Sequence, residues 1–250
     1  MLSSTKVGLG LPSRDDEIKE FQNFRRALGR LAIPVAGYAF HPENTGSTGT
    51  VEHRGYRVRE FDLNVFRKNI EEQRFDREYS AEEMWTNYAY FMNAVLPVAG
   101  DANVKMALHP DDPPVAMMNG VAKLFTHYEG YRLAEKFAGG SRHWGLLFCV
   151  GTWSEGGHKM GKDVFEMIRD FGGRVKIVAV HFRNVSSPPP HLHESFPDDG
   201  YLDMYRVMKT LREVGFNGTA IPDHIPGLVG DKRLRRAGSS GACKRGSRMK

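Results

Sequence analysis

The strongest constraint on the fold is a regular alternation of short apolar stretches with longer amphipathic ones in the second half of the chain. The apolar stretches have the length of buried strands, and they are residues 104–108, 145–149, 175–181 and 219–222. Apolar residues recur at helical spacing in residues 121–137, 161–171 and 201–214. Since parallel strands need crossover connections, usually helices, the alternation predicts an α/β fold on a parallel sheet.

The first half of the sequence predicts two helices and one strand. Ser13 with Asp16, and Ser80 with Glu83, have the three-residue spacing of a capping box, so a helix is expected after each serine. Pro97 is expected to end the second helix, and residues 32–40 are expected to form a strand. Residues 41–79 show no clear period, which is typical of a functional lid or an insertion.

Composition favours one large globular domain. The chain has 250 residues, of which 40% are hydrophobic, so it can bury a sizeable core. It contains no apolar run long enough to cross a bilayer and no secretory signal at its start, so we expect a cytoplasmic protein without a membrane partner. Cys149 and Cys243 form no close pair, which excludes a disulfide framework.

The net charge of +5 does not indicate a nucleic-acid-binding protein. Residues 231–250 carry +7, which leaves −2 for residues 1–230, and the latter show no basic stripe with interleaved aromatic residues. We therefore expect a catalytic domain at 1–230, followed by a basic tail at 231–250 that lacks helical periodicity.

A polar residue of the kind that binds metals ends each of the last four predicted strands. These residues are His109, Cys149, His181 and Asp223, and they are 40, 32 and 42 residues apart. A (β/α)8 barrel spends about 31 residues on each strand–helix unit and gathers the carboxyl ends of its strands at the active site. Two imidazoles, a thiolate and a carboxylate meeting there would suit a divalent transition metal.

Each of these residues has a simpler explanation when it is taken alone. Cys149 is by itself more typical of a buried apolar cysteine, and His181 could be a core histidine with its hydrogen bonds satisfied. That four such residues end four successive strands by chance is much less probable than that any one of them does. The combined placement favours the metal site.

Four further residues are candidates for chemistry near these strand ends. His224 follows Asp223 and suits general acid–base catalysis, although an exposed loop histidine is the alternative. Arg183 lies two residues beyond His181 and could bind a substrate carboxylate with both arms of its guanidinium. His193 and Glu194 follow a run of prolines, where a surface pair is more typical than a substrate contact.

Five short motifs resemble the mannonate dehydratase family, in matching order. They are Lys105-Met-Ala-Leu-His-Pro-Asp-Asp-Pro-Pro, Phe148-Cys-Val-Gly, Val180-His-Phe-Arg-Asn-Val, His193-Glu-Ser and Ile221-Pro-Asp-His. The resemblance implies a xylose-isomerase-like barrel that dehydrates D-mannonate to 2-keto-3-deoxy-D-gluconate in hexuronate (glucuronate) catabolism, with Mn²⁺ or Fe²⁺. It also implies that the metal ligands are His109, Cys149, His181 and Asp223, and that His224 is an acid–base residue.

The sequence also departs from that family. The family has three further strand–helix units before the point where this chain begins and a closing helical region with a tyrosine implicated in catalysis, so we expect an incomplete barrel of about five of the eight units. Such a chain is expected to show little or no dehydratase activity. A sugar isomerase or epimerase on the same barrel, and an inactive truncated remnant, remain as alternatives. The sequence is also compatible with a homo-oligomer.

Overall fold

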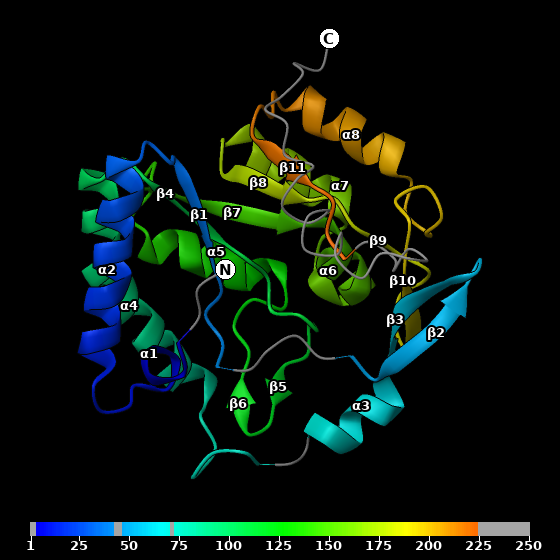
Figure 1. Cartoon of the computed structure of the whole chain (residues 1–250), viewed down its shortest axis with the longest axis horizontal. Helices are drawn as coiled ribbons and strands as arrows, with labels where there is room; N and C mark the ends of the chain where they lie inside the picture. Colours follow the sequence, from blue (N-terminus) through cyan, green and yellow to red (C-terminus); the bar gives the residue numbers. More distant parts are fainter. Residues whose placement is uncertain (1–3, 43–46, 71–72, 225–250) are drawn as a thin grey trace. The chain divides into compact units, whose positions relative to one another are not determined.

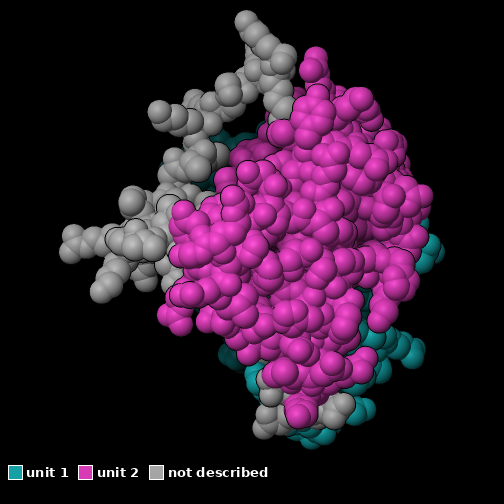
Figure 2. Space-filling model, turned by 90° about the vertical axis from the view of Figure 1, so that its right-hand side faces the viewer, with its two compact units in different colours: residues 1–45, 70–147 teal, residues 46–69, 148–250 magenta. Residues whose placement is uncertain are grey.

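The computed structural model describes residues 4–42, 47–70 and 73–224. The chain divides into two compact units, which Figure 2 colours separately: Met1–Thr45 with Ile70–Leu147, and Gly46–Asn69 with Phe148–Lys250. The predicted basic tail at 231–250 lies outside the described residues.

The first unit combines parallel strands with long helices (Figure 1). Its elements are α1 (Thr5–Leu9), α2 (Arg14–Arg30), β1 (Val35–Tyr38), α4 (Ala81–Asp101), β4 (Lys105–Leu108), β5 (Met117–Met118), β6 (Val121–Ala122), α5 (Tyr128–Phe137) and the greater part of β7 (Trp144–Cys149). Strand β4 pairs in parallel with β1 on one side and with β7 on the other. Helices α2 and α4 pack side by side, with the Phe21 and Phe91 rings 5.1 Å apart edge to face.

Buried aromatic residues join the helices of this unit to its strands. The Tyr38 hydroxyl on β1 lies 2.9 Å from the Tyr88 hydroxyl on α4, and the Trp144 indole donates to Tyr38 at 3.1 Å. All three side chains are buried, so each polar end finds a partner inside the core, as buried tyrosine and tryptophan require. The position of β4, and therefore of the loop that carries His109, is held by this core.

The second unit contains an antiparallel sheet as well as parallel strands (Figure 1). Its elements are β2 (Gly49–His53), β3 (Tyr56–Asp62), α3 (Leu63–Ile70), α6 (Val150–Gly156), the 3₁₀ helix η1 (Gly157–Met160), α7 (Val164–Met167), the π-helical turn η2 (Ile168–Gly172), β8 (Ile177–His181), β9 (Asn184–Val185), β10 (His191–Ser195), α8 (Met204–Glu213) and β11 (Thr219–Ile221). The antiparallel sheet has the order β2-β3-β10-β9. Strands β8 and β11 pair in parallel, with Ile221 opposite His181.

The principal sheet confirms the predicted α/β class. Five strands are hydrogen-bonded in the order β1-β4-β7-β8-β11, and the pairings β1 with β4, β4 with β7 and β8 with β11 are parallel. The described residues thus contain five strands of the principal sheet, against the eight of a closed (β/α)8 barrel. None of the helices in the described residues is both long and apolar enough to span a membrane.

Three details differ from the sequence-based expectations. Helix α4 runs past Pro97 to Asp101. Residues 121–137 begin as strand β6 and become helical only at Tyr128, because Asn119 and Gly120 form the tight turn between β5 and β6 with φ of 53° and 80°. Ser13 precedes α2 but makes no side-chain capping hydrogen bond, whereas the capping box of Ser80 and Glu83 is present as predicted.

Candidate metal centre

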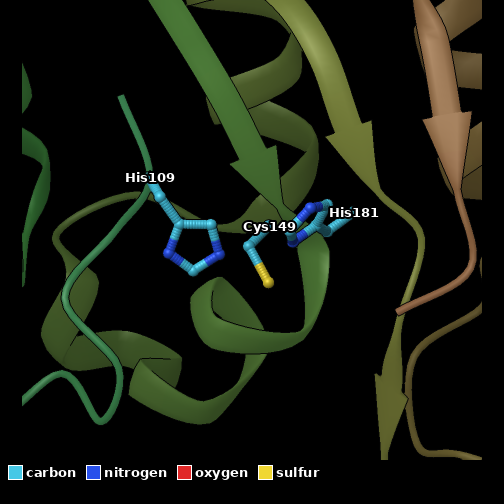
Figure 3. Close-up of side chains that lie close together, drawn as sticks. All are labelled: His109, Cys149 and His181. Atoms are coloured by element: carbon cyan, nitrogen blue, oxygen red, sulfur yellow. The ribbon is translucent and has the colours of Figure 1, made fainter. Parts of the chain in front are cut away.

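Three of the predicted ligands lie together at strand ends. His109 directly follows β4, while Cys149 and His181 are the last residues of β7 and β8. One ligand atom from each of these side chains lies within 4.8 Å of the other two, and Figure 3 shows the thiol of Cys149 with the two imidazole rings around it. His109 and Cys149 are buried and His181 is half-buried, so the cluster is shielded from bulk water.

The local structure orients Cys149 and His109. Cys149 is the N-cap of α6, where the Thr152 hydroxyl lies 3.2 Å from its sulfur and the Thr152 backbone N–H lies 3.5 Å away. Donors that point at the sulfur stabilise the thiolate form that binds metals. Nδ1 of His109 lies 2.8 Å from the Pro110 carbonyl oxygen, so this nitrogen donates and Nε2 is left as the ligand atom.

The fourth predicted ligand, Asp223, lies beside His181. Two residues beyond β11, its Oδ2 is 3.4 Å from Nδ1 of His181. Burial opposes protonation of His181, but the interactions with Asp223 and Cys149 outweigh it and raise the histidine pKa to about 10. Burial likewise opposes ionisation of Asp223, but the interaction with the neighbouring His181 prevails and lowers the pKa of the carboxyl. Asp223 is therefore held as a carboxylate next to the cluster.

The chemistry of these donors fits a divalent transition metal. A thiolate is a soft ligand, imidazole suits Zn, Fe and Cu, and magnesium or calcium would require oxygen ligands throughout. His109, Cys149 and His181 supply one sulfur and two nitrogens, and Asp223 adds an oxygen beside them. These residues form a possible metal-binding cluster.

The structure gives Arg183 other partners than the substrate carboxylate that the sequence suggested. Its Nη2 lies 2.9 Å from Oε1 of Glu155 and 3.1 Å from the Thr152 hydroxyl, and its Nη1 lies 3.4 Å from Oε1 of Glu194. The same Nη2 is 3.8 Å from the sulfur of Cys149. With 3% of its side chain exposed, Arg183 links the strand ends to one another.

His224 contacts a buried carboxylate. Its Nδ1 lies 2.5 Å from Oε1 of Glu194, and its Nε2 lies 3.7 Å from Oδ1 of Asp223. The His224 backbone has a φ of 50°, in the left-handed region, where non-glycine residues are uncommon and often occur at functional sites. The ring is about three-quarters buried. His224 is thus held by Glu194 and is not an exposed loop histidine.

Sequence reasoning missed three residues of this site. Glu194 is buried, although a surface position seemed more typical, and Glu155 is the direct partner of Arg183. Arg59 on β3 lies 3.5 Å from Nδ1 of His224 and 3.8 Å from Glu194, yet it belongs to the segment that showed no period. A hairpin signal was present there, since two stretches of alternating polarity flank the dipeptide Arg54-Gly55.

A protein-family model for D-mannonate dehydratase (UxuA) matches residues 54–245 of this chain. The mannonate dehydratase of Streptococcus suis is 31% identical to it over 254 residues, which cover 89% of this chain and 67% of that protein. The mannonate dehydratase of Streptococcus pneumoniae is 30% identical, with the same two coverages. The chain spans about two thirds of the length of these relatives.

Solved structures agree with the sequence relatives. The crystal structure of mannonate dehydratase from Streptococcus suis serotype 2 superposes with a TM-score of 0.81 at 29% identity and covers 93% of this chain and 69% of that one. A zinc-bound IOLI protein has a TM-score of 0.53 at 16% identity, with coverages of 83% and 60%, and supports the fold alone. The chain belongs to the D-mannonate dehydratase family of hydro-lyases.

Proposed function

We propose that this chain removes water from D-mannonate to give 2-keto-3-deoxy-D-gluconate, using Mn²⁺ or Fe²⁺ bound by His109, Cys149, His181 and Asp223. The observation that carries the proposal is that Cys149, His181, Asp223 and His224 all fall within the family match at 54–245. The donor set supports a transition metal, as argued above. The bound ion would supply positive charge to the substrate's carboxylate side, where negative charge develops when a neighbouring proton leaves.

The reaction breaks two bonds of the sugar acid. The proton on the carbon next to the carboxylate leaves, the hydroxyl on the following carbon departs as water after it is protonated, and the resulting enol becomes the 2-keto acid. One group must take a proton and one must give a proton. A histidine can do either near neutral pH.

His224 is the proton-transfer residue of this proposal. Its Nδ1 is engaged by Glu194 at 2.5 Å and by Arg183 at 3.0 Å, so Nε2 is the nitrogen that is left to exchange a proton with the substrate. The contact with Glu194 holds the ring of His224 with Nε2 3.7 Å from Oδ1 of Asp223. Arg183 positions both residues through Glu194 and the Asp223 side chain, from which its Nε is 3.8 Å away.

The test is to supply the purified chain with Mn²⁺ or Fe²⁺ and offer D-mannonate and an aldose such as D-xylose in separate assays. From the sequence alone, five strands in place of eight lead us to expect little or no dehydratase activity, but the family match over residues 54–245 makes formation of a 2-keto acid from D-mannonate alone the expected result. Conversion of the aldose to its isomer or epimer, without a 2-keto acid, would instead identify an isomerase or epimerase. Absence of any product from a chain that binds the metal would identify an inactive remnant and overturn the proposal.

A further inference from the structure

We infer that Arg59, on β3 of the antiparallel sheet, binds the carboxylate of the sugar acid next to His224. The inference rests on the proposed function and names the residue that recognises the charged end of the substrate. All the residues that carry it, Arg59, Arg183, Glu194 and His224, lie in the second compact unit.

The first step of the argument is that the other arginine of the site is already neutralised. Arg183 is 3% exposed and contacts the carboxylates of Glu155 and Glu194 at 2.9 and 3.4 Å. A substrate carboxylate would have to displace a buried ion pair in order to reach it, and breaking such a pair leaves an uncompensated charge in the protein interior. Arg183 is therefore unsuited to receive the anion.

The second step is that Arg59 is close to the reacting side chain and yet is exposed. Its Nη1 lies 3.5 Å from Nδ1 of His224 and 3.8 Å from Oε1 of Glu194, and 46% of the side chain is exposed. Nδ1 of His224 already lies 2.5 Å from Oε1 of Glu194 and 3.0 Å from Nη1 of Arg183, so Arg59 at 3.5 Å is not its main partner. The contact of Arg59 with Glu194 is longer than a hydrogen bond.

The third step is that the sheet holds Arg59 at this place. Strand β10 pairs with β3 in an antiparallel register that sets His193 opposite Glu60. Continuing that register by one residue sets Glu194 opposite Arg59, and directly opposed residues project from the same face of a sheet. On its other side β10 pairs with β9, where Glu194 stands opposite Val185. The strand that carries Glu194 is thus fixed from both sides.

The chemistry of the guanidinium suits the task. It is planar, charged throughout the neutral pH range and presents paired N–H donors that match both oxygens of a carboxylate. A sugar acid bound in this way has its carboxylate within reach of Arg59 and the adjacent carbon near His224, where the proton is to be removed. An uncharged polyol of the same length would gain nothing from Arg59.

The experiment compares Arg59→Gln and Arg59→Lys with the unmodified protein in the dehydration assay with Mn²⁺. Arg59→Gln should raise the KM for D-mannonate about 10- to 100-fold, the usual loss for a hydrogen-bonded ion pair, and should change kcat less than about fivefold, because His224 and the metal ligands remain. The KM of Arg59→Lys should lie between those of the unmodified protein and Arg59→Gln, since lysine keeps the charge and loses the paired donors. Competitive inhibition by D-mannitol, which lacks the carboxylate, should be the same in all three proteins.

The matched control is Arg57→Gln, which removes an exposed arginine two residues earlier on the same strand and should leave KM unchanged. An unchanged KM in Arg59→Gln, with normal turnover of D-mannonate by the unmodified protein, would overturn the inference alone. Equal weakening of D-mannonate and D-mannitol binding would also overturn it, since that pattern indicates general damage to the site. Failure of the unmodified protein to act on D-mannonate would overturn the proposed function and the inference together.

Discussion

Nη2 of Arg183 lies 2.9 Å from Oε1 of Glu155, and both side chains are almost wholly buried. The pair sits where β8 ends, and the same guanidinium also reaches the Thr152 hydroxyl and Glu194. A buried arginine with several fixed partners contributes mainly to the geometry of its surroundings. Its replacement should therefore affect the stability of the fold as well as catalysis.

Arg183→Lys should lower the free energy of unfolding by about 2–4 kcal/mol, because one ammonium group cannot replace a guanidinium fork that serves several acceptors. The melting temperature measured by circular dichroism should fall by roughly 4–16 °C for a domain of this size. Arg57→Lys, at an exposed position, is the control and should leave the melting temperature unchanged. Undiminished stability in Arg183→Lys would contradict a structural role for the pair with Glu155.

Cys149→Ser should weaken Mn²⁺ or Fe²⁺ binding by at least about 10- to 100-fold, because a hydroxyl is a poorer ligand than a thiolate and even partners that only orient a ligand contribute that much. Metal content after dialysis, together with titration calorimetry, measures the effect. Cys243→Ser changes the other cysteine of the chain and should bind metal as the unmodified protein does. Equal metal content in both variants would remove Cys149 from the site.

His224→Asn should retain the bound metal but lower kcat by about 10²- to 10⁴-fold, the usual scale of a general acid–base residue. His158→Asn, at an exposed histidine on η1, provides a control with the same change of residue type. The measurements are metal content and the rate of 2-keto acid formation. Loss of metal along with activity would show that His224 is a ligand or a structural residue and not a proton carrier.

Arg25→Met should stabilise the chain by on the order of 2–3 kcal/mol and raise the melting temperature by several degrees. Arg25 on α2 is fully buried, and within the described residues its guanidinium has no hydrogen-bond partner and lies over the rings of Phe21 and Phe24. Methionine fills a similar volume without a charge. Arg26→Met, at the exposed neighbour, removes the same charge and should leave stability nearly unchanged.

The pH dependence of the Arg25 effect has a defined sign. Burial lowers the pKa of Arg25 to about 10, and the charge interaction with Tyr38 opposes this only in part. Between pH 10 and the higher ordinary pKa of an arginine, the unfolded chain binds the proton more tightly than the folded chain, so the free energy of unfolding rises with pH in that window. The difference in the free energy of unfolding between Arg25→Met and the unmodified protein should therefore be largest below pH 10 and should decrease above it. If this difference stayed constant up to pH 11.5, burial of the Arg25 charge would be excluded as the cause of the stabilisation.

The clustering of His109, Cys149 and His181 could be foreseen because strand ends are positions that a sequence reveals well. Alternating or continuous apolar residues located β4, β7 and β8 to within a few residues, and parallel strands place their carboxyl ends at one edge of the sheet. The Ser80 capping box was equally visible, since it depends only on local hydrogen bonds.

Pro97 shows why a local rule can fail. Proline has no N–H to donate to the carbonyl of the preceding turn of α4, but Pro97 is exposed on the water side of the helix. The Gln22 side chain also donates to the Ala94 carbonyl at 2.8 Å, close to the interrupted turn. Val95 and Ala99 are buried on either side of the proline, so tertiary packing keeps the helix continuous.

The β2–β3 hairpin escaped prediction because one of its faces is mostly exposed. Strand β2 alternates between half-buried and exposed positions, β3 has only Val58 and Phe61 buried, and the turn uses Arg54 with Gly55 in place of the usual Asn-Gly. Charged residues such as Arg59 therefore looked like those of an irregular loop. The environment of Arg59 depends on pairing with β10, more than 120 residues later in the sequence, which no local pattern reveals.

The two-residue turn at Arg54 and Gly55, with φ of 51° and 80°, sets the register of β3 against β2, and β3 pairs in turn with β10. Side chains on a strand alternate faces, so one residue inserted or deleted at this turn, with β2 held in place, would move Arg59 to the opposite face and present Val58 or Glu60 in its place. The length of this turn thus decides which side chain β3 presents beside His224. Inserting or deleting a single codon there would exchange a cation at the site for an apolar or acidic side chain.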